Sequence, residues 1–101
     1  MITATISFTV APGKNFEATE YFQQVVRHVK KLTDVDARVL NQLGGPMGHF
    51  VLVSQYETLA AWDTARTKIA RDTPFQKMVA EAGKDGIFVP GSVVSAIYQQ
   101  V

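Results

Sequence analysis

The 101-residue sequence predicts an α+β fold with the element order β-α-β-β-α-β. Two observations predict it: four segments have the residue pattern of strands and two regions have that of helices, and they follow one another in this order. The length is near that of one domain, and an apolar content of 47% is enough for one hydrophobic core. We therefore expect residues 1–101 to form a single domain.

Four segments of the chain are predicted to be strands. Residues 1–10 alternate between apolar and mostly hydroxyl side chains, which is the period of a strand, and Pro12 and Gly13 end it. Residues 35–43 and 49–57 are the second and third, and residues 92–101 are the last. The centre of the third, Phe50 to Val53, is apolar on both faces, as in a strand that is covered on both sides. The turn between the second and third strands is predicted at residues 44–48, "GGPMG".

Two regions have the apolar spacing of helices. The first begins at Asn15, which is predicted to cap it, and ends near residues 30–34. Its apolar positions recur every three or four residues: Ala18, Phe22, Val25, Val29 and Leu32. In the second region Thr58 is the predicted cap. A capping-box pattern at Thr73, Pro74 and Gln76 predicts that this region is broken at residues 72–73.

This element order specifies a split β-α-β, or ferredoxin-like, sandwich: a four-stranded antiparallel sheet with helices on one face. Right-handed crossovers place the first and third strands in the middle of the sheet. The pattern leaves open which side of each strand meets the helices. In the first strand, for instance, it is either the Ile/Phe set or the Thr/Ser set.

The second face of the sheet predicts a partner. Whichever set of side chains points away from the helices, that face stays substantially apolar, and large exposed apolar patches are rare on monomers. A second copy of the chain is the simplest cover, because homodimers are the commonest oligomers. We therefore predict a homodimer in which two sheets face each other and close a barrel.

Composition excludes several classes of protein. A formal charge of +1 with scattered basic residues gives no reason to expect nucleic acid as a partner. The absence of cysteine excludes disulfides, thiol catalysis and thiolate metal sites. We find no signal-peptide pattern after Met1 and no apolar run of the length that a membrane helix needs, so we expect a cytoplasmic protein with no membrane partner.

The two histidines are the most obvious candidates for chemistry. His49, at the start of the third strand, could act as acid, base or ligand near neutral pH, but a half-exposed residue beside a glycine turn is the favoured interpretation. His28 has no acidic residue four positions away on its helix and is expected to be solvated. Because the two lie on separate elements without metal-ligand spacing, no metal site is predicted.

Polar side chains on the strands suggest a ligand cavity. Thr5 and Ser7 belong to a hydroxyl stripe on a strand predicted to be covered on both faces, and Tyr56 and Tyr98 combine an apolar ring with a polar tip. The alternative is that all of these are ordinary strand packing. The predicted ligand-binding residues are Thr5, Ser7, Asn41, Ser54, Tyr56 and Tyr98, with His49 as the best catalytic candidate.

The chain resembles the dimeric α+β barrel superfamily over nearly its whole length. The resemblance lies in the element order, "VAPGK" after the first strand, "FVLVSQYETLAAW" from the third strand into a helix, and "ARTKIARDTPFQKMVAEA" as a broken second helix. It is most similar to the NIPSNAP-like and antibiotic-biosynthesis-monooxygenase-like groups. This resemblance implies relatives that include cofactor-free monooxygenases of polycyclic phenols, haem-degrading oxygenases and stress-induced proteins. The resemblance also implies that the haem-degrading members rely on an Asn, a Trp and a histidine of the second helix. The chain has Trp62 but no histidine in its second helical region, and this disfavours haem degradation.

Three hypotheses about function follow. The first is an enzyme or binder of a small aromatic molecule with a pocket between the sheet and its helices; an enzyme of this kind would be a cofactor-independent monooxygenase. The second is a non-catalytic or stress-related dimerisation module, and the third is a haem-binding protein. The first is favoured, and it predicts no cofactor.

Overall fold

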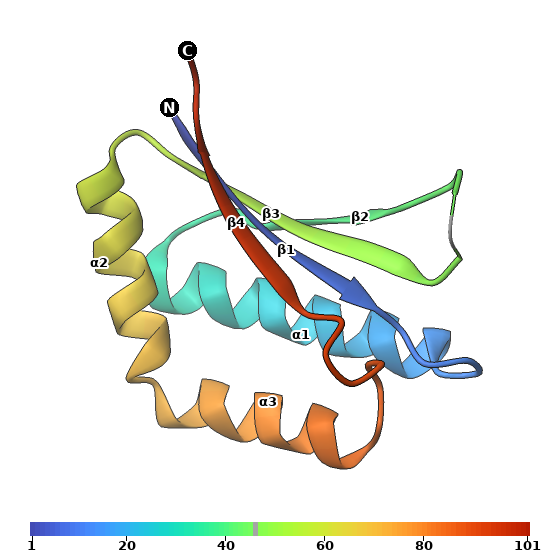
Figure 1. Cartoon of the computed structure of the whole chain (residues 1–101). Helices are drawn as coiled ribbons and strands as arrows, with labels where there is room; N and C mark the ends of the chain where they lie inside the picture. Colours follow the sequence, from blue (N-terminus) through green and yellow to red (C-terminus); the bar gives the residue numbers. More distant parts are fainter. Residues whose placement is uncertain (46) are drawn as a thin grey trace.

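The computed structural model describes residues 1–45 and 47–101, which form four strands and three helices in the predicted order (Figure 1). The elements are β1 (Ile2–Thr9), α1 (Asn15–Thr33), β2 (Arg38–Asn41), β3 (His49–Tyr56), α2 (Leu59–Ala70), α3 (Thr73–Lys84) and β4 (Val94–Gln99). The predicted break of the second helical region is present, because α2 and α3 are separate helices. Pro46, which belongs to the predicted turn at 44–48, lies outside the described residues.

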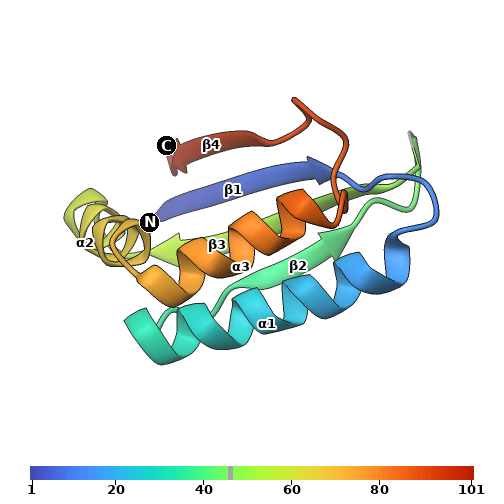
Figure 2. The ribbon, with the colours of Figure 1, turned by 90° about the horizontal axis from the view of Figure 1, so that it is seen from below.

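The strands form one antiparallel sheet in the order β2-β3-β1-β4, so the first and third strands occupy the centre as predicted. The helices lie on one side of this sheet (Figure 1). Seen from below, α1 and α3 run side by side across that face, while α2 stands at one end of it (Figure 2). The predicted ferredoxin-like α+β sandwich is confirmed.

The register of the strands settles which side of each strand meets the helices. Directly paired residues of antiparallel strands project to the same face, so the pair Phe8 and Phe50 shares one face. The ring of Phe8 packs against Phe22 of α1, with 5.2 Å between ring centroids, and this face is therefore the helix side. The Ile/Phe set of β1 points toward the helices, and the Thr/Ser set points away.

We call the side of the sheet away from the helices the outer face. By register it carries Arg38 and Leu40 of β2, His49, Val51, Val53 and Gln55 of β3, Thr3, Thr5, Ser7 and Thr9 of β1, and Val94, Ala96 and Tyr98 of β4. In the part of the chain that the structure describes, no helix lies over this face, because all three helices are on the opposite side of the sheet (Figure 1). Consistent with that, Leu40 is 50% exposed and Val94 is 59% exposed.

The hydrophobic core is centred on Phe22 of α1, whose side chain is 3% exposed. Its ring centroid lies 5.2 to 5.9 Å from those of Phe8, Tyr21, Phe50 and Phe88. The buried residues around this aromatic group are Val10, Ala18, Ala82 and Ile87. The core is thus the contact between α1, the sheet and the segment that joins α3 to β4.

The starts of α1 and α2 depend on different caps. Thr58 caps α2 as predicted, since its hydroxyl accepts the Ala61 N–H at 3.1 Å. The prediction that Asn15 caps α1 is wrong, because Asn15 is the first residue inside the helix. The carbonyl of Lys14 already accepts the N–H of Ala18 at 2.9 Å, which makes Lys14 the cap residue, with no side-chain hydrogen bond.

The start of α3 differs by one residue from the predicted capping box. Asp72, and not Thr73, is the cap, and its carboxylate accepts the Phe75 N–H at 2.9 Å. The side chain of Gln76 donates to the carbonyl of Ala70 at 2.7 Å instead of reaching back to the cap. The reason is that a carboxylate, a stronger acceptor than a hydroxyl, stands one position earlier.

Candidate functional site

A groove of about 540 Å³ lies on the helix side of the sheet, between α1 and β2. Its α1 wall has two rows of side chains, because residues four apart lie on the same face of a helix. Phe22 and Val26 form an apolar row, and Thr19, Gln23 and Arg27 form a polar row. The groove therefore has an apolar side and a polar side along the same helix.

The opposite wall of the groove comes from the sheet. Val39 and Asn41 of β2, Ala37 just before it and Phe50 of β3 line this side. Val39 and Asn41 project toward the helices because they pair with Leu52 and Phe50 of β3. A concave site of this volume, with aromatic and aliphatic walls and a few polar groups, has the properties of small-molecule sites.

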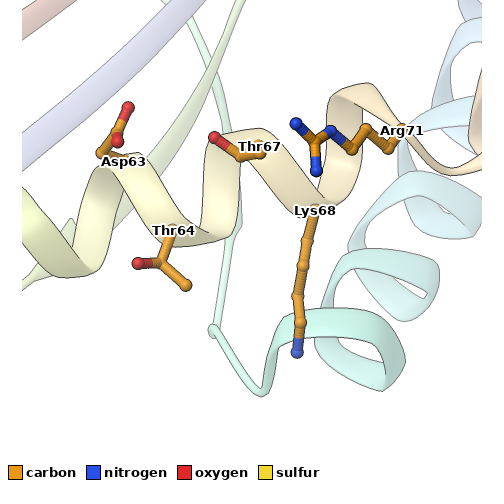
Figure 3. Close-up of a pocket in the computed structure, with 5 residues that line it drawn as sticks. All are labelled: Asp63, Thr64, Thr67, Lys68 and Arg71. Atoms are coloured by element: carbon orange, nitrogen blue, oxygen red, sulfur yellow. The ribbon is translucent and has the colours of Figure 1, made fainter.

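A second hollow, of about 420 Å³, lies along α2 (Figure 3). Its lining residues all come from α2 and the residue after it: Asp63, Thr64, Thr67, Lys68 and Arg71. In Figure 3, Thr64 and Lys68 point to one side of the helix and Asp63 and Thr67 to the other. Since one helix supplies every wall and the side chains do not converge, the groove between α1 and β2 is the better candidate site.

His49 lies on the outer face, away from the groove. It begins β3 directly after Gly48 and is half-buried, in agreement with the favoured interpretation of a residue at a turn–strand junction. Its Nε2 atom lies 3.4 Å from the hydroxyl oxygen of Thr9 on the neighbouring strand. Ser92 completes this polar group, since its hydroxyl accepts the Thr9 N–H at 3.2 Å and lies 3.3 Å from the Thr9 carbonyl.

The structure separates the predicted ligand-binding residues into two sets. Asn41, Ser54 and Tyr56 project to the helix side, and of these Asn41 lines the groove. Thr5, Ser7 and Tyr98 project to the outer face together with His49. Within one chain these residues therefore do not line a common cavity, because the sheet itself lies between the two sets.

His28 is the residue that sequence reasoning misjudged. The expectation of a solvated helix position is wrong: its Nε2 atom lies 2.5 Å from Oδ2 of Asp72, and the imidazole side chain is only 24% exposed. The ring also stacks on Phe75, with 6.3 Å between centroids. This hydrogen bond from His28 lowers the pKa of Asp72, and the Phe75 N–H acts in the same direction.

Three polar residues of the groove, Thr19, Gln23 and Arg27, were not predicted as site residues. Their signal in the sequence is a polar row at four-residue spacing next to the apolar row of the same helix. That signal is weak, because most surface helices have one. Only the position of β2 beside this row distinguishes it from solvated helix surface.

In the part of the chain that the structure describes, no three side chains of histidine, aspartate or glutamate gather where they could hold a metal ion. Over the same residues, none of the helices combines the length and the apolar character that crossing a bilayer requires.

Comparison with known proteins places this fold among solved structures. No family model matches the chain, and no curated protein sequence matches it. An uncharacterized NIPSNAP domain protein from Burkholderia xenovorans is 15% identical, with a TM-score of 0.80 over 100% of this chain and 95% of that one. A NIPSNAP family protein from Agrobacterium tumefaciens has the same identity and TM-score over 99% of this chain and 85% of that one.

The second predicted group is also found. A structure named antibiotic biosynthesis monooxygenase is 14% identical, with a TM-score of 0.74 over 100% of this chain and 99% of that one. The chain is therefore similar in fold to both groups that the sequence resembles, which confirms the predicted fold relationship. At these identities the likeness establishes the fold alone.

Proposed function

We propose that this chain is a homodimeric protein that binds a small aromatic molecule in the groove between α1 and β2. The observation that carries the proposal is the groove itself, whose volume of about 540 Å³ lies in the range of small-molecule sites. The partly exposed ring of Phe50 offers aromatic surface for stacking, and Thr19, Gln23 and Asn41 offer hydrogen bonds at the margin.

The groove supports ligand binding more directly than it supports a reaction. The residues that line the groove include no paired carboxylates, no histidine and no nucleophile with an adjacent base. Oxygenation of a bound ring, by analogy with the name of one similar structure, would then depend on the reactivity of the ligand more than on a catalytic side chain. Oxygen uptake is accordingly the activity to assay on any ligand that binds.

The outer face supports the dimeric part of the proposal. Leu40, Val94 and Tyr98 are at least half exposed there, at 50%, 59% and 58%. Arg38 is the one residue of that face with a permanent charge, so two copies can meet with little like-charge repulsion. Light scattering at micromolar concentration should therefore return twice the 11.1 kDa mass of the chain. A stable mass of one chain would contradict the dimer.

Ligand binding is tested with naphthol and a pair of matched variants. Gln23 and its neighbour Gln24 are both exposed, but only Gln23 lines the groove. Gln23→Trp places a bulky ring at the groove and should weaken naphthol binding at least tenfold, as measured by calorimetry. Gln24→Trp introduces the same side chain outside the groove and should leave the affinity unchanged.

Two results would contradict ligand binding in this groove. If phenols, quinones and haem all fail to raise the melting temperature or to bind in calorimetry, the chain is a dimerisation module without a ligand. If naphthol binds and both tryptophan variants bind it equally well, the ligand site lies elsewhere.

A further inference from the structure

We propose that the ligand of the groove is an aromatic carboxylate, with its carboxylate held by Arg27 and its ring against Val26 and Phe50. This inference rests on the proposed function, because it names the chemical class of ligand for the same groove. It is carried by the kind of charge in the groove, by the lack of an internal partner for that charge, and by the order of polar groups along α1.

Arg27 is the one charged side chain among the residues that line the groove. No carboxylate lines it, so the charge that the groove presents to a ligand is positive. A guanidinium stays protonated at any physiological pH and offers parallel N–H donors that match a carboxylate. A groove with apolar walls and one such group therefore favours an organic anion over a neutral ring of the same shape.

The two acidic residues that follow α1, and Asp72 at the start of α3, are engaged with other basic residues. The ammonium of Lys30 lies 3.1 Å from Asp34 and 3.2 Å from Asp36. Asp72 accepts from His28. Among the described residues, Arg27 itself has no ion pair, so its charge is available to a bound anion.

The groove also has a direction. Thr19, Gln23 and Arg27 follow one another at four-residue intervals, which places the two ends of the row ~12 Å apart on the helix axis. Because β2 returns along α1 after a short connection, Ala37 lies toward the Arg27 end and Asn41 toward the Thr19 end. The carboxylate of the ligand belongs at the Arg27 end, and a hydroxyl or carbonyl group at the far end can reach Thr19 or Asn41.

The test compares two probes that differ in charge but hardly in shape, naphthoate and its neutral amide, naphthamide. Calorimetry at low salt should show naphthoate binding about fivefold tighter, a modest preference because Arg27 is solvent-exposed. Arg27→Gln should abolish the preference by weakening naphthoate alone, and Arg27→Lys should retain part of it. Raising the salt concentration should reduce the preference in the wild-type protein.

Lys31→Gln is the matched control. Lys31 is exposed, lies four residues from Arg27 on the same helix and does not line the groove, so this variant changes the net charge equally. It should keep the preference for naphthoate. If it loses the preference as fully as Arg27→Gln does, the preference comes from the overall positive charge of α1, and the assignment to Arg27 is wrong.

The two proposals fail in different ways. Equal binding of naphthoate and naphthamide to the wild-type protein overturns the carboxylate inference but agrees with ligand binding in the groove. A loss of both affinities together in Arg27→Gln also overturns it, since the side chain would then act by packing and not by charge. Failure of both probes and of naphthol to bind would remove the groove as a site, and the inference with it.

Discussion

The two faces of the sheet both carry apolar side chains, but only one of them is covered by the chain itself. On the helix side, Ile2 is 6% exposed and the ring of Phe8 packs against Phe22 of α1. On the outer face, Leu40 is 50% exposed and Val94 is 59% exposed. One polypeptide of this length thus completes a single layer of packing and leaves the apolar side chains of the outer face uncovered.

The difference also explains where polar groups stand. On the outer face, the side chains of β1 carry hydroxyl groups, which can hydrogen-bond either to water or to a partner. On the helix side, aromatic rings pack around Phe22. The groove lies at the β2 edge of the helix side, where α1 and the sheet leave space for a ligand. The proposed ligand binding and the proposed association therefore use opposite faces, and substitutions can test them separately.

Removing the centre of the covered face should have the largest effect on folding. Phe22→Ala deletes a ring that is 3% exposed and packs against four other aromatic rings. We expect a loss of about 3–5 kcal/mol in the free energy of unfolding, because the cavity cannot fully close. Urea denaturation measures it.

Phe16→Ala is the control for that substitution. Phe16 lies on the same helix but is 73% exposed, so its removal should change stability by only about 0.5 kcal/mol or less. Equal costs for the two variants would show that the aromatic group around Phe22 is not the centre of the core.

A charge on the outer face should break the proposed dimer while leaving the fold intact. Val51→Asp places a carboxylate in the middle of that face, between Leu40 and Ser7 on the neighbouring strands. Burying it without a partner costs several kcal/mol, so association should weaken by roughly 100-fold. Light scattering should then return the 11.1 kDa mass of a single chain with an unchanged circular-dichroism spectrum.

A substitution on the helix side of the molecule is the control. Val79→Asp introduces the same charge on α3, where Val79 is already 47% exposed. This variant should keep the mass of a dimer. A dimer that survives Val51→Asp but not Val79→Asp would move the interface from the sheet to the helices.

Most of the fold could be predicted because it depends on local patterns. The change from alternating residues to three- and four-residue spacing locates β1 and α1, and Asp72–Thr73 marks the break between α2 and α3. The facing of the strands could not be predicted. Both sets of side chains on β3 are largely apolar, so only its register with β1, seen in pairs such as Phe8 and Phe50, decides between them.

The candidate site was less predictable for the same reason. Asn41 was predicted and lines the groove, but Thr5 and Tyr98, predicted with it, are on the other side of the sheet. The partner of His28 stands 44 residues away in sequence. No spacing rule within one helix finds such a pair, because it depends on the angle at which the α2–α3 junction meets α1.

Apart from the control substitutions, that junction carries the smallest effect we predict, and it tests one of the contacts between the helices on the covered face. Asp72 caps α3 and accepts from His28, so Asp72→Ala removes both interactions and should cost about 1 kcal/mol through the cap. Asp72→Asn keeps an acceptor for the Phe75 N–H and removes only the charge. It should therefore cost less than the alanine variant.

The dependence on pH separates the charge from the cap. Because His28 lowers the pKa of Asp72 in the folded protein, the stabilisation by the carboxylate is present above its ordinary pKa of 3.8 and is lost as the pH falls through the lower folded value. The difference in melting temperature between wild type and Asp72→Asn should be full at neutral pH and shrink below about pH 4. Asp63→Asn, which breaks only the exposed pair with Arg66, should change stability by less than about 0.5 kcal/mol. A difference between wild type and Asp72→Asn that stays constant down to pH 2 would mean that the carboxylate contributes by its shape and hydrogen bonding and not by its charge.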